Sequence, residues 1–162
     1  MTFHLRPAKP DDFSELYAVD QSCFSQGIAW SKAELAYFLR YPGNFSLVVE
    51  EDGVPGIAGF AIAGLQRKRG LMFGRLITID VRTHCRRRGV GQMLMNAIEE
   101  RLREAGAESI QLEVAINNGV AQEFYGRRGF VRTGRIPGYY KGRLDAYVME
   151  KRLKAKSAAR LQ

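Results

Sequence analysis

Cysteine is scarce in this sequence, and its two cysteines lie far apart. Cys23 and Cys85 form neither a Cys-x-x-Cys pair nor a His-rich spacing, the patterns that indicate zinc sites. Two isolated cysteines are typical of reduced thiols in a cytosolic protein. The sequence therefore predicts no metal site.

Long apolar runs are also missing. The sequence contains no run of about 18 apolar residues, the length of a membrane-spanning helix. Its first residues lack the cationic and then apolar pattern of a signal peptide. We therefore expect a soluble cytoplasmic enzyme or binding module without a membrane partner.

Linkers, repeats and low-complexity segments are absent as well. Apolar residues make up 46% of the 162 residues, enough for one ordinary domain with a core. Much of the net charge of +8 lies in the last dozen residues, which hold no acid but contain Lys151, Arg152, Lys154, Lys156 and Arg160. We predict one domain over residues 1–153 and a basic, disordered tail over residues 154–162. A protein-wide nucleic-acid surface is not expected, although the tail can touch RNA.

The most informative stretch runs from Leu76 to Gly106. It begins with a β-branched-rich apolar run, typical of a strand covered on both faces: Leu76, Ile77, Ile79 and Val81. A cationic loop follows, with Arg82, His84, Arg86, Arg87 and Arg88. Beyond Gly89 the apolar residues recur at helical spacing, and Gly106 has the position of a left-handed C-cap. The pattern predicts a helix that opens on glycines at the end of a strand.

The start of this helix is a candidate anion site. The first N–H groups of a helix have no partner within it and carry the positive end of its dipole, so a phosphate is a suitable occupant. Gly89 and Gly91 let a phosphate approach the main chain, and the neighbouring arginines raise the local positive potential. The alternative is a surface loop whose arginines are only solvated and whose glycines only relax a turn.

The first forty residues predict a strand and two helices. Residues 3–6 alternate like a short strand, and Asp11 or Asp12 can cap the first helix. Ser31 and Glu34 form a capping box that opens the second helix.

The connection between these two helices lacks any period. It covers residues 22–30 and carries two large rings, Phe24 and Trp30. Either the rings pack on the core as part of a lid or they contact the substrate.

Strands dominate the middle of the chain. Residues 45–50 and 57–65 predict two strands, and residues 66–74 are expected to form a basic, glycine-containing hairpin connection. After the central helix, residues 110–116 alternate strictly between apolar and more polar side chains. Glu113 falls on the more polar side.

The last third of the chain predicts one helix and two strands. Asn118 can cap the helix, and Gly129 ends it. The strands cover residues 130–136 and 144–151, joined by residues 137–142. The complete order is β-α-α-β-β-β-α-β-α-β-β, a mixed α/β (α+β) arrangement with one strand-helix-strand crossover.

Two motifs on these elements resemble one known family. Arg86-x-x-Gly89-x-Gly91 resembles the pyrophosphate-binding signature of the GNAT superfamily of acetyl-CoA-dependent N-acetyltransferases. The segment from Asn118 to Phe130 resembles the part of these enzymes that closes around the pantetheine arm. The resemblance spans nearly the whole chain and implies the GNAT fold, a mixed central sheet of about seven strands flanked by about four helices.

Within the superfamily, the chain is most similar to the ribosomal-protein-alanine N-acetyltransferases and related protein N-terminal acetyltransferases. This similarity lies in Leu112-Glu113-Val114, in the paired tyrosines Tyr139 and Tyr140, and in Asp145-Ala146. It implies an acyltransferase that acts on a primary amine.

The resemblance implies acetyl-CoA as the cofactor and assigns its contacts. One strand would pair its backbone with the pantetheine arm through Ile79, Asp80 and Val81. The loop and helix start would hold the pyrophosphate through Arg86, Arg87, Arg88, Gly89, Val90, Gly91 and Gln92. The segment that closes around the arm includes Asn118, Ala121 and Phe124.

The resemblance also assigns the catalytic groups. Tyr125 corresponds to the family's general acid, and Glu113 to the general base of the ribosomal alanine acetyltransferases. A carboxylate, directly or through a water, can take the amine's proton, and a tyrosine hydroxyl can protonate the departing sulfur. The alternatives are a core tyrosine and a mid-strand carboxylate paired with an arginine. Cys85 lies beside the anion loop, but no His/Asp partner is placed to activate it, so we expect it to be structural.

The acceptor is less well defined by the sequence. Tyr139 and Tyr140 either line an acceptor groove or are turn aromatics. Ala29 stands where the subfamily usually has proline, and Asp80 where the alanine acetyltransferases have a small apolar residue. We expect a protein or peptide amine, such as the N-terminus of a ribosomal protein, as substrate of a monomer or homodimer. The alternatives are a small amine (polyamine, amino acid or antibiotic) and a non-catalytic acetyl-CoA sensor associated with RNA.

Overall fold

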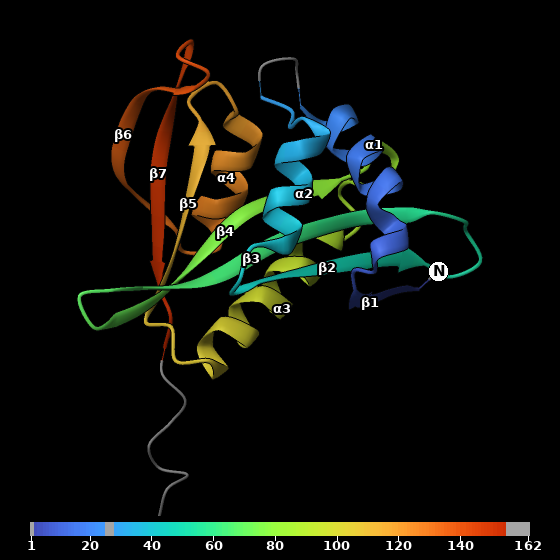
Figure 1. Ribbon diagram of the computed structural model, residues 1–162, viewed down its shortest axis with the longest axis horizontal. Coiled ribbons are helices and arrows are strands. Elements are labelled where there is room, and N and C mark those ends of the chain that lie inside the picture. The colour runs from blue at the N-terminus through green and yellow to red at the C-terminus, as the bar shows by residue number, and fades with distance from the viewer. Residues whose placement is uncertain (1, 25–27, 155–162) are drawn as a thin grey trace, which may run out of the picture. The chain divides into compact units, whose positions relative to one another are not determined.

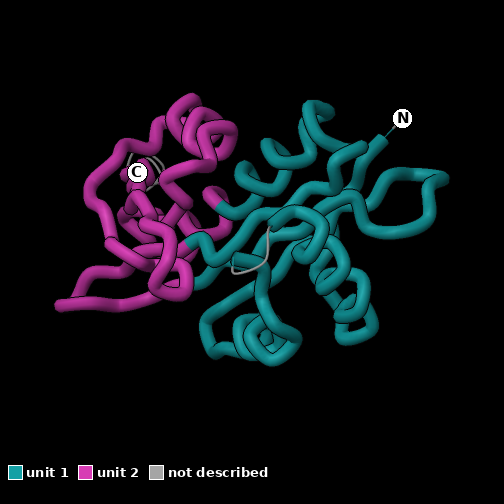
Figure 2. Tube along the Cα trace, turned by 90° about the horizontal axis from the view of Figure 1, so that it is seen from above, with its two compact units in different colours: residues 1–64, 76–98 teal, residues 65–75, 99–162 magenta. Residues whose placement is uncertain are grey.

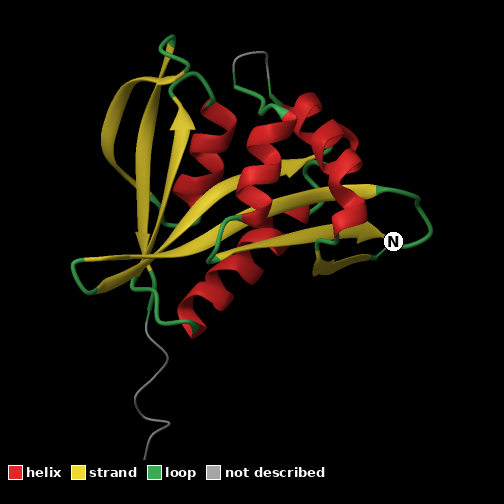
Figure 3. Ribbon diagram, viewed as in Figure 1, coloured by secondary structure: helices red, strands yellow, loops and turns green. Residues whose placement is uncertain are grey.

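The helices and strands follow in the predicted order (Figure 1). A computed structural model describes residues 2–24 and 28–154. Its strands hydrogen-bond in the order β1-β2-β3-β4-β5-β7-β6, with β4 and β5 parallel. Within the described residues, seven strands and four α-helices confirm the predicted mixed sheet flanked by helices (Figure 3). The predicted tail lies, apart from Lys154, outside the described residues.

The chain forms two compact units (Figure 2). Unit 1 comprises Met1–Gly64 and Leu76–Ile98, and unit 2 comprises Leu65–Arg75 and Glu99–Gln162. Three elements contribute to both units: β3 (Ile57–Lys68), β4 (Leu71–Val81) and α3 (Val90–Glu104). A single domain over residues 1–153 stays a prediction. Across the described ranges, no helix is both long enough and apolar enough to cross a bilayer.

Unit 1 is built on antiparallel strands covered by helices. Its remaining elements are β1 (Phe3–Pro7), α1 (Phe13–Cys23), α2 (Lys32–Arg40) and β2 (Asn44–Glu51). Strand β2 pairs with β1 and β3, so that Val49 lies opposite Leu5 and Val48 lies opposite Phe60. Helices α1 and α2 lie side by side over these strands (Figure 1).

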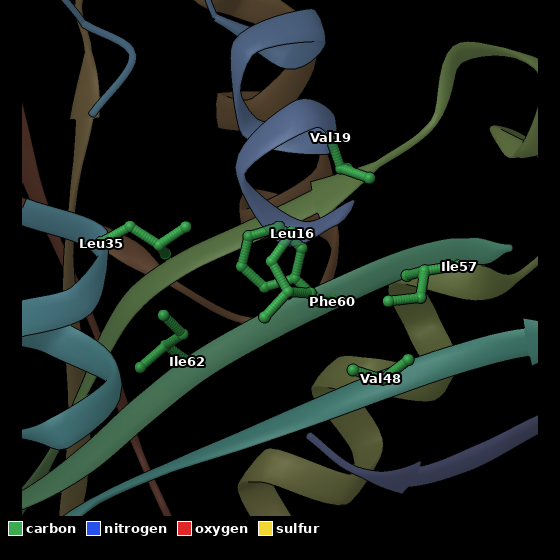
Figure 4. Close-up of a cluster of buried hydrophobic side chains, with 7 residues drawn as sticks. All are labelled: Leu16, Val19, Leu35, Val48, Ile57, Phe60 and Ile62. Carbon is green, nitrogen blue, oxygen red and sulfur yellow. The ribbon is translucent and has the colours of Figure 1, made fainter. Parts of the chain in front are cut away.

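The core of unit 1 lies where α1 and α2 meet β3 (Figure 4). Leu16 and Val19 of α1 and Leu35 of α2 pack with Phe60 and Ile62 of β3, and all five are at most 1% exposed. Residues three apart on a helix, or two apart on a strand, share a face. This spacing explains why the two residues from α1 meet the two residues from β3. Burying each such side chain contributes about 1.5–3 kcal/mol, so this cluster fixes both helices on the strand.

The opposite face of β3 is built from small residues. Gly59, Ala61 and Ala63 alternate with the large residues and are also buried. A Cβ atom on Gly59 would lie 2.8 Å from the carbonyl oxygen of Asp80 and 3.0 Å from Cγ1 of Val90. Because no side chain fits there, glycine lets β4 and the start of α3 approach β3 closely.

The two helix starts in unit 1 differ from each other. Asp12 precedes α1 but makes no side-chain cap bond to it, so the predicted cap is wrong. Pro10–Asp12 forms a short 3-10 turn, and the Asp12 carboxylate instead accepts two hydrogen bonds from Arg6, at 2.8 and 2.9 Å. Ser31 and Glu34 form the predicted capping box at the start of α2, with reciprocal bonds of 3.1 and 2.9 Å.

Unit 2 contains the parallel strand pair and the final strands. Its remaining elements are β5 (Ser109–Ala115), α4 (Gly119–Arg127), β6 (Val131–Tyr140) and β7 (Leu144–Arg152). In the parallel pair, Gly74 lies opposite Ile110 and Arg75 lies opposite Gln111. Strand β7 pairs antiparallel with both β5 and β6.

A buried acid joins three parts of unit 2. Glu99 of α3 is 5% exposed and accepts from Nζ of Lys151 at 2.7 Å and from Nη2 of Arg128 at 3.0 Å. A buried carboxylate with two cationic partners is compensated for its loss of water. The contacts therefore tie α3 to β7 and to the end of α4.

The hairpin predicted over residues 66–74 is present, but its connection is much shorter than predicted. Strand β3 continues to Lys68 and β4 begins at Leu71. Arg69 and Gly70 have positive φ angles of 52° and 79°, as in two-residue hairpin turns whose twist matches the flanking strands. Cross-strand pairing therefore extends both strands through a segment whose basic composition indicated a loop.

The connection predicted over residues 137–142 is likewise shorter than predicted. Strand β6 continues to Tyr140, which pairs with Leu144 of β7. The turn contains Lys141 and Gly142, with φ angles of 53° and 75°. Proline and glycine coincide with a register shift between Ile136 and Tyr140, and the chain stays extended through it.

Candidate active site

The loop after β4 holds the arginines of the proposed anion site. Arg86 donates from Nε to the carbonyl oxygen of Val81 at 3.0 Å. Arg88 forms a bidentate ion pair with Glu51, and the side chain of Arg87 is exposed. Two of the three arginines therefore shape the loop through contacts within unit 1, which the sequence did not indicate.

The backbone of this loop has the shape of an anion site. Arg87 and Gly89 have positive φ angles of 61° and 88°, and turns with left-handed residues form concave nests of N–H groups. The first bond of the helical ladder runs from N of Met93 to O of Gly89 at 2.9 Å. The donors that precede this ladder are the N–H groups of Val90, Gly91 and Gln92. This helix start can therefore hold a phosphate.

Strand β4 carries the residues predicted to pair with the pantetheine arm. Asp80 is 1% exposed, whereas Ile79 and Val81 are half-buried. The Val81 carbonyl accepts from Arg86 and also from Sγ of Cys23 at 3.4 Å. This carbonyl oxygen therefore already has partners. The other backbone groups of Ile79, Asp80 and Val81 are the ones that could pair with an extended amide chain.

In unit 2, side chains fix the turn between β5 and α4. Oδ1 of Asn118 accepts from N of Ala121 at 3.1 Å, which confirms the predicted cap. Nε2 of Gln122 donates to the carbonyl oxygens of Ala115 and Ile116, both at 3.0 Å. Because Oδ1 is used by the cap, the Nδ2 donors of Asn118 are the groups suited to a ligand.

Tyr125 lies on the buried side of α4. It is 6% exposed, and its ring meets the rings of Phe124 and Phe130 edge-on, with centroids 5.4 and 5.6 Å apart. The N–H of Phe130 donates to the carbonyl oxygen of Tyr125 at 3.0 Å. The ring is therefore fixed by packing, and the role of its hydroxyl as general acid stays a prediction.

Glu113 is held in a closed cluster within unit 2. Arg75 forms a bidentate ion pair with it, in which Nη1 lies 3.0 Å from Oε2 and Nη2 contacts Oε1. The Tyr139 hydroxyl donates to Oε1 of Glu113 at 3.3 Å and accepts from Nη2 of Arg75 at 3.2 Å. The Glu113 side chain is 8% exposed and that of Arg75 is 26% exposed. Strands β4, β5 and β6 thus each contribute one member.

This cluster decides between the two environments considered for Glu113. The carboxylate is paired with an arginine, and both of its oxygens are engaged. Bidentate pairs of this kind are strong and directional, so a bridging water is the simplest route from Glu113 to an amine. Sequence analysis missed Arg75, because identifying the partner required the register that places it opposite Gln111.

The two tyrosines at the end of β6 belong to the same region. Their rings are perpendicular, with centroids 4.9 Å apart, and both residues are in a strand, so the turn alternative is wrong. Burial, and then the charge of Glu113, raises the pKa of Tyr139, and burial raises that of Tyr140. Both hydroxyls are therefore protonated donors at neutral pH.

In unit 1, Trp30 packs against the core. It lies against the hydrophobic cluster, and its ring is 4.8 Å from that of Phe38 at an angle of 31°. Phe24 ends α1 and donates from its N–H to the carbonyl oxygen of Asp20 at 3.2 Å. The lid alternative for Trp30 is thus the better supported one, and substrate contact stays a prediction.

The two cysteines are free. Burial raises the pKa of the Cys85 thiol and of the Cys23 thiol, which disfavours the reactive thiolate. The expectation that Cys85 is structural agrees with this. In the part of the chain that the structure describes, no three His, Cys, Asp or Glu side chains gather as metal ligands would.

Comparison with known proteins identifies the class. Residues 13–130 match the model of the Acetyltransferase (GNAT) family, so the chain belongs to this family of acetyltransferase enzymes. An N-alpha-acetyltransferase of Saccharolobus solfataricus is 25% identical over 93% of both chains.

Solved structures share the fold. The ribosomal-protein-S18-alanine N-acetyltransferase of Escherichia coli superimposes with a TM-score of 0.79, at 22% identity over 97% of both chains. Arabidopsis thaliana NAA60 in complex with acetyl-CoA superimposes with a TM-score of 0.81, at 20% identity over 94% of this chain and 99% of that one. At these identities the two structures support the fold alone.

Proposed function

We propose that this enzyme transfers the acetyl group of acetyl-CoA to the α-amino group of a protein or peptide, with ribosomal proteins among the candidate acceptors. The observation that favours this acceptor over a polyamine is the ion pair at Glu113, because Arg75 neutralises this carboxylate. A polyamine would need several uncompensated acids. The name of the Saccharolobus relative also supports a protein α-amine.

The cofactor assignment follows the anion site of unit 1. The start of α3 would hold the pyrophosphate through its unpaired N–H groups, and the backbone of β4 would pair with the pantetheine arm. Asn118, Ala121 and Phe124 would contact the arm through an amide and an apolar surface. An acetyl-CoA complex is known for the structurally similar Arabidopsis protein.

The transfer proceeds by direct attack of the neutral amine on the thioester carbonyl. The new C–N bond forms as the C–S bond breaks, and no covalent enzyme intermediate is needed. A protein α-amino group has a pKa of about 7.7–8.0, so modest assistance suffices near neutral pH. Glu113 takes the amine's proton through a water, and the Tyr125 hydroxyl protonates the leaving sulfur.

The remaining assignments concern the acceptor contacts, the cellular location and the oligomeric state. Phe24, Trp30, Tyr139 and Tyr140 are the proposed acceptor contacts. A cytoplasmic location and a monomeric or homodimeric state complete the proposal. Free thiols at Cys23 and Cys85 are consistent with a reducing compartment.

The proposal is tested by measuring CoA release with three acceptor classes. These are peptides with a free α-amine and no lysine, N-terminally blocked peptides with one lysine, and polyamines. We expect turnover with the first class, and mass spectrometry should place the acetyl group on the α-nitrogen. Acetylation of the ε-amine alone, or preferential turnover of polyamines, would overturn the proposed acceptor. A Tyr125→Phe control identifies turnover that does not depend on the site.

A further inference from the structure

Two acids lie together in the interior of unit 1, outside the groups used above for proton transfer. Asp20 near the end of α1 is 2% exposed, and Asp80 in β4 is 1% exposed. Neither has a cationic hydrogen-bond partner in the described chain. Burying two unpaired carboxylates side by side is very unfavourable, so their arrangement requires an explanation.

An unpartnered oxygen of Asp80 points to one proton bound by the pair. Oδ1 of Asp80 accepts from Oγ1 of Thr78 at 2.6 Å, whereas its buried Oδ2 meets no donor. The carboxyl groups of Asp80 and Asp20 are close enough that Asp20 contributes to the raised pKa of Asp80. Two carboxyl groups can hydrogen-bond to each other only if one of them carries a proton. A proton on Asp80 lets it donate to Asp20 and gives its unsatisfied oxygen a partner.

The second bond of Asp20 leads to Trp30. Oδ2 of Asp20 accepts from the backbone N of Trp30 at 2.9 Å. The neighbouring Gln21 holds the other side of the same residue, because its Nε2 donates to the Trp30 carbonyl oxygen at 2.7 Å. Both backbone groups of Trp30 are thus bound by α1. Hydrogen bonds therefore join Thr78 to Asp80 and Trp30 to Asp20, and a proton held between the two carboxyl groups would link these bonds into one chain.

The charges around the pair favour retention of the proton. Burial, and then the hydrogen bond and charge of Asp20, raises the pKa of Asp80 well above its usual range. Burial also raises the pKa of Asp20. Glu34 on α2 adds to the rise at Asp20, and Arg86 in the loop opposes the rise at Asp80. Cys23 on α1 faces the same site, and burial favours its neutral thiol.

We propose that Asp20 and Asp80 are positioning residues that share one proton and thereby hold the backbone of Trp30 onto the β4 side of unit 1. When the proton is present, the segment at Trp30 is held in its packed position. When the proton leaves, two negative charges repel each other in a buried site, and Asp80 can no longer donate to Asp20. The effect on acceptor binding rests on the proposed function, whereas the effect on Trp30 does not.

The environment of Trp30 can be measured directly, because it is the only tryptophan of the chain. Fluorescence emission is recorded from about pH 5 to about pH 10, the range that a buried carboxyl pair can reach. In the unmodified protein we expect the emission to shift to longer wavelength as the pair loses its proton. Asp80→Asn retains an N–H donor toward Asp20 and has no proton to lose, so its emission should not change over this range.

Two further variants separate the shared proton from general stability. Asp20→Asn can still accept from the Trp30 N–H and can donate to Asp80, so its emission should also be independent of pH. Asp80→Ala has no donor and should show the shifted emission at every pH. The same titration in the unmodified protein and in both Asn variants would overturn the shared proton.

Acceptor binding is measured separately with an α-amine peptide. We expect the peptide KM of the unmodified enzyme to rise over the pH range in which the fluorescence shifts. The KM of Asp20→Asn should lack this rise. If the fluorescence shifts but the peptide KM changes with pH in the same way in the unmodified enzyme and in Asp20→Asn, the role in acceptor positioning is overturned. Absence of any acetyl transfer to peptides would instead contradict the proposed function, and the fluorescence result would still decide the shared proton.

Discussion

Replacing Glu113 with Gln removes a charge from the cluster of unit 2 with little change in shape. In the unmodified protein, Arg75 donates to both carboxylate oxygens and the Tyr139 hydroxyl donates to one of them. Gln offers one oxygen, and its NH2 group faces a donor. A hydrogen bond to a charged group contributes about 1.5–3 kcal/mol. Because Glu113 is 8% exposed, we expect the free energy of unfolding to fall by about 2–3 kcal/mol.

The same substitution removes the proposed base. Loss of a general base typically lowers the rate by about 10²–10⁴-fold, and we expect kcat/KM of Glu113→Gln to fall by at least about 10²-fold. Urea unfolding measures the stability, and CoA release at a temperature where the variant is folded measures the activity. Both are needed, because a misplaced Arg75 can also lower activity.

Arg75→Met is the matched control, because it disrupts the ion pair and keeps the carboxylate. Removing one partner of a buried pair costs about 3–5 kcal/mol, and we expect the lower end because Arg75 is 26% exposed. If Glu113 acts as a base, Arg75→Met should keep kcat/KM within about tenfold of the unmodified enzyme. Equal losses in the two variants, or a change below about threefold in Glu113→Gln, would refute the reasoning.

Three further predictions concern other parts of the molecule. Tyr125→Phe should lower kcat by about 10²-fold or more while calorimetry shows unchanged CoA affinity; a normal kcat would exclude the acid role. Gly59→Ala should lower the unfolding free energy by about 1–3 kcal/mol, because its Cβ would lie 2.8 Å from the Asp80 carbonyl oxygen. Gly126→Ala, which meets nothing within 4 Å, is its control, and equal urea midpoints would contradict this prediction. The raised pKa of Asp80 favours the folded state most fully below its unfolded pKa of about 3.9. This contribution is lost as the pH rises through the folded pKa, so stability should decline more steeply with pH in the unmodified protein than in Asp80→Asn.

The elements of this protein follow from local patterns in its sequence. Each of these patterns involves only a few residues: the alternation in β5, the capping box at Ser31, and the glycine that follows Arg87 at position 89. Such features depend on side-chain period, helix capping and backbone freedom, and these are properties of neighbouring residues. The order of elements and the glycine-flanked start of α3 were therefore predictable.

The boundaries of two hairpins were not predictable in this way. Basic residues and glycines in β3 and β4, and proline and glycine in β6, indicate loops when read locally. Strands β3 and β4 continue because each pairs with the other, whereas β6 stays extended through a register shift between Ile136 and Tyr140. Pairing energy outweighs a weak local preference.

The sequence by itself determined the kinds of groups at the candidate site, but the tertiary structure decided their partners. Glu113 was identified as a polar residue on a strand, whereas its pairing with Arg75 depends on the parallel register of β4 and β5. Asp80 was predicted to bind the cofactor through its backbone. The carboxyl group that affects its charge is that of Asp20, which comes from α1. The physical reason is that the state of a charge is set by burial and by nearby charges. Residues that are distant along the chain supply both.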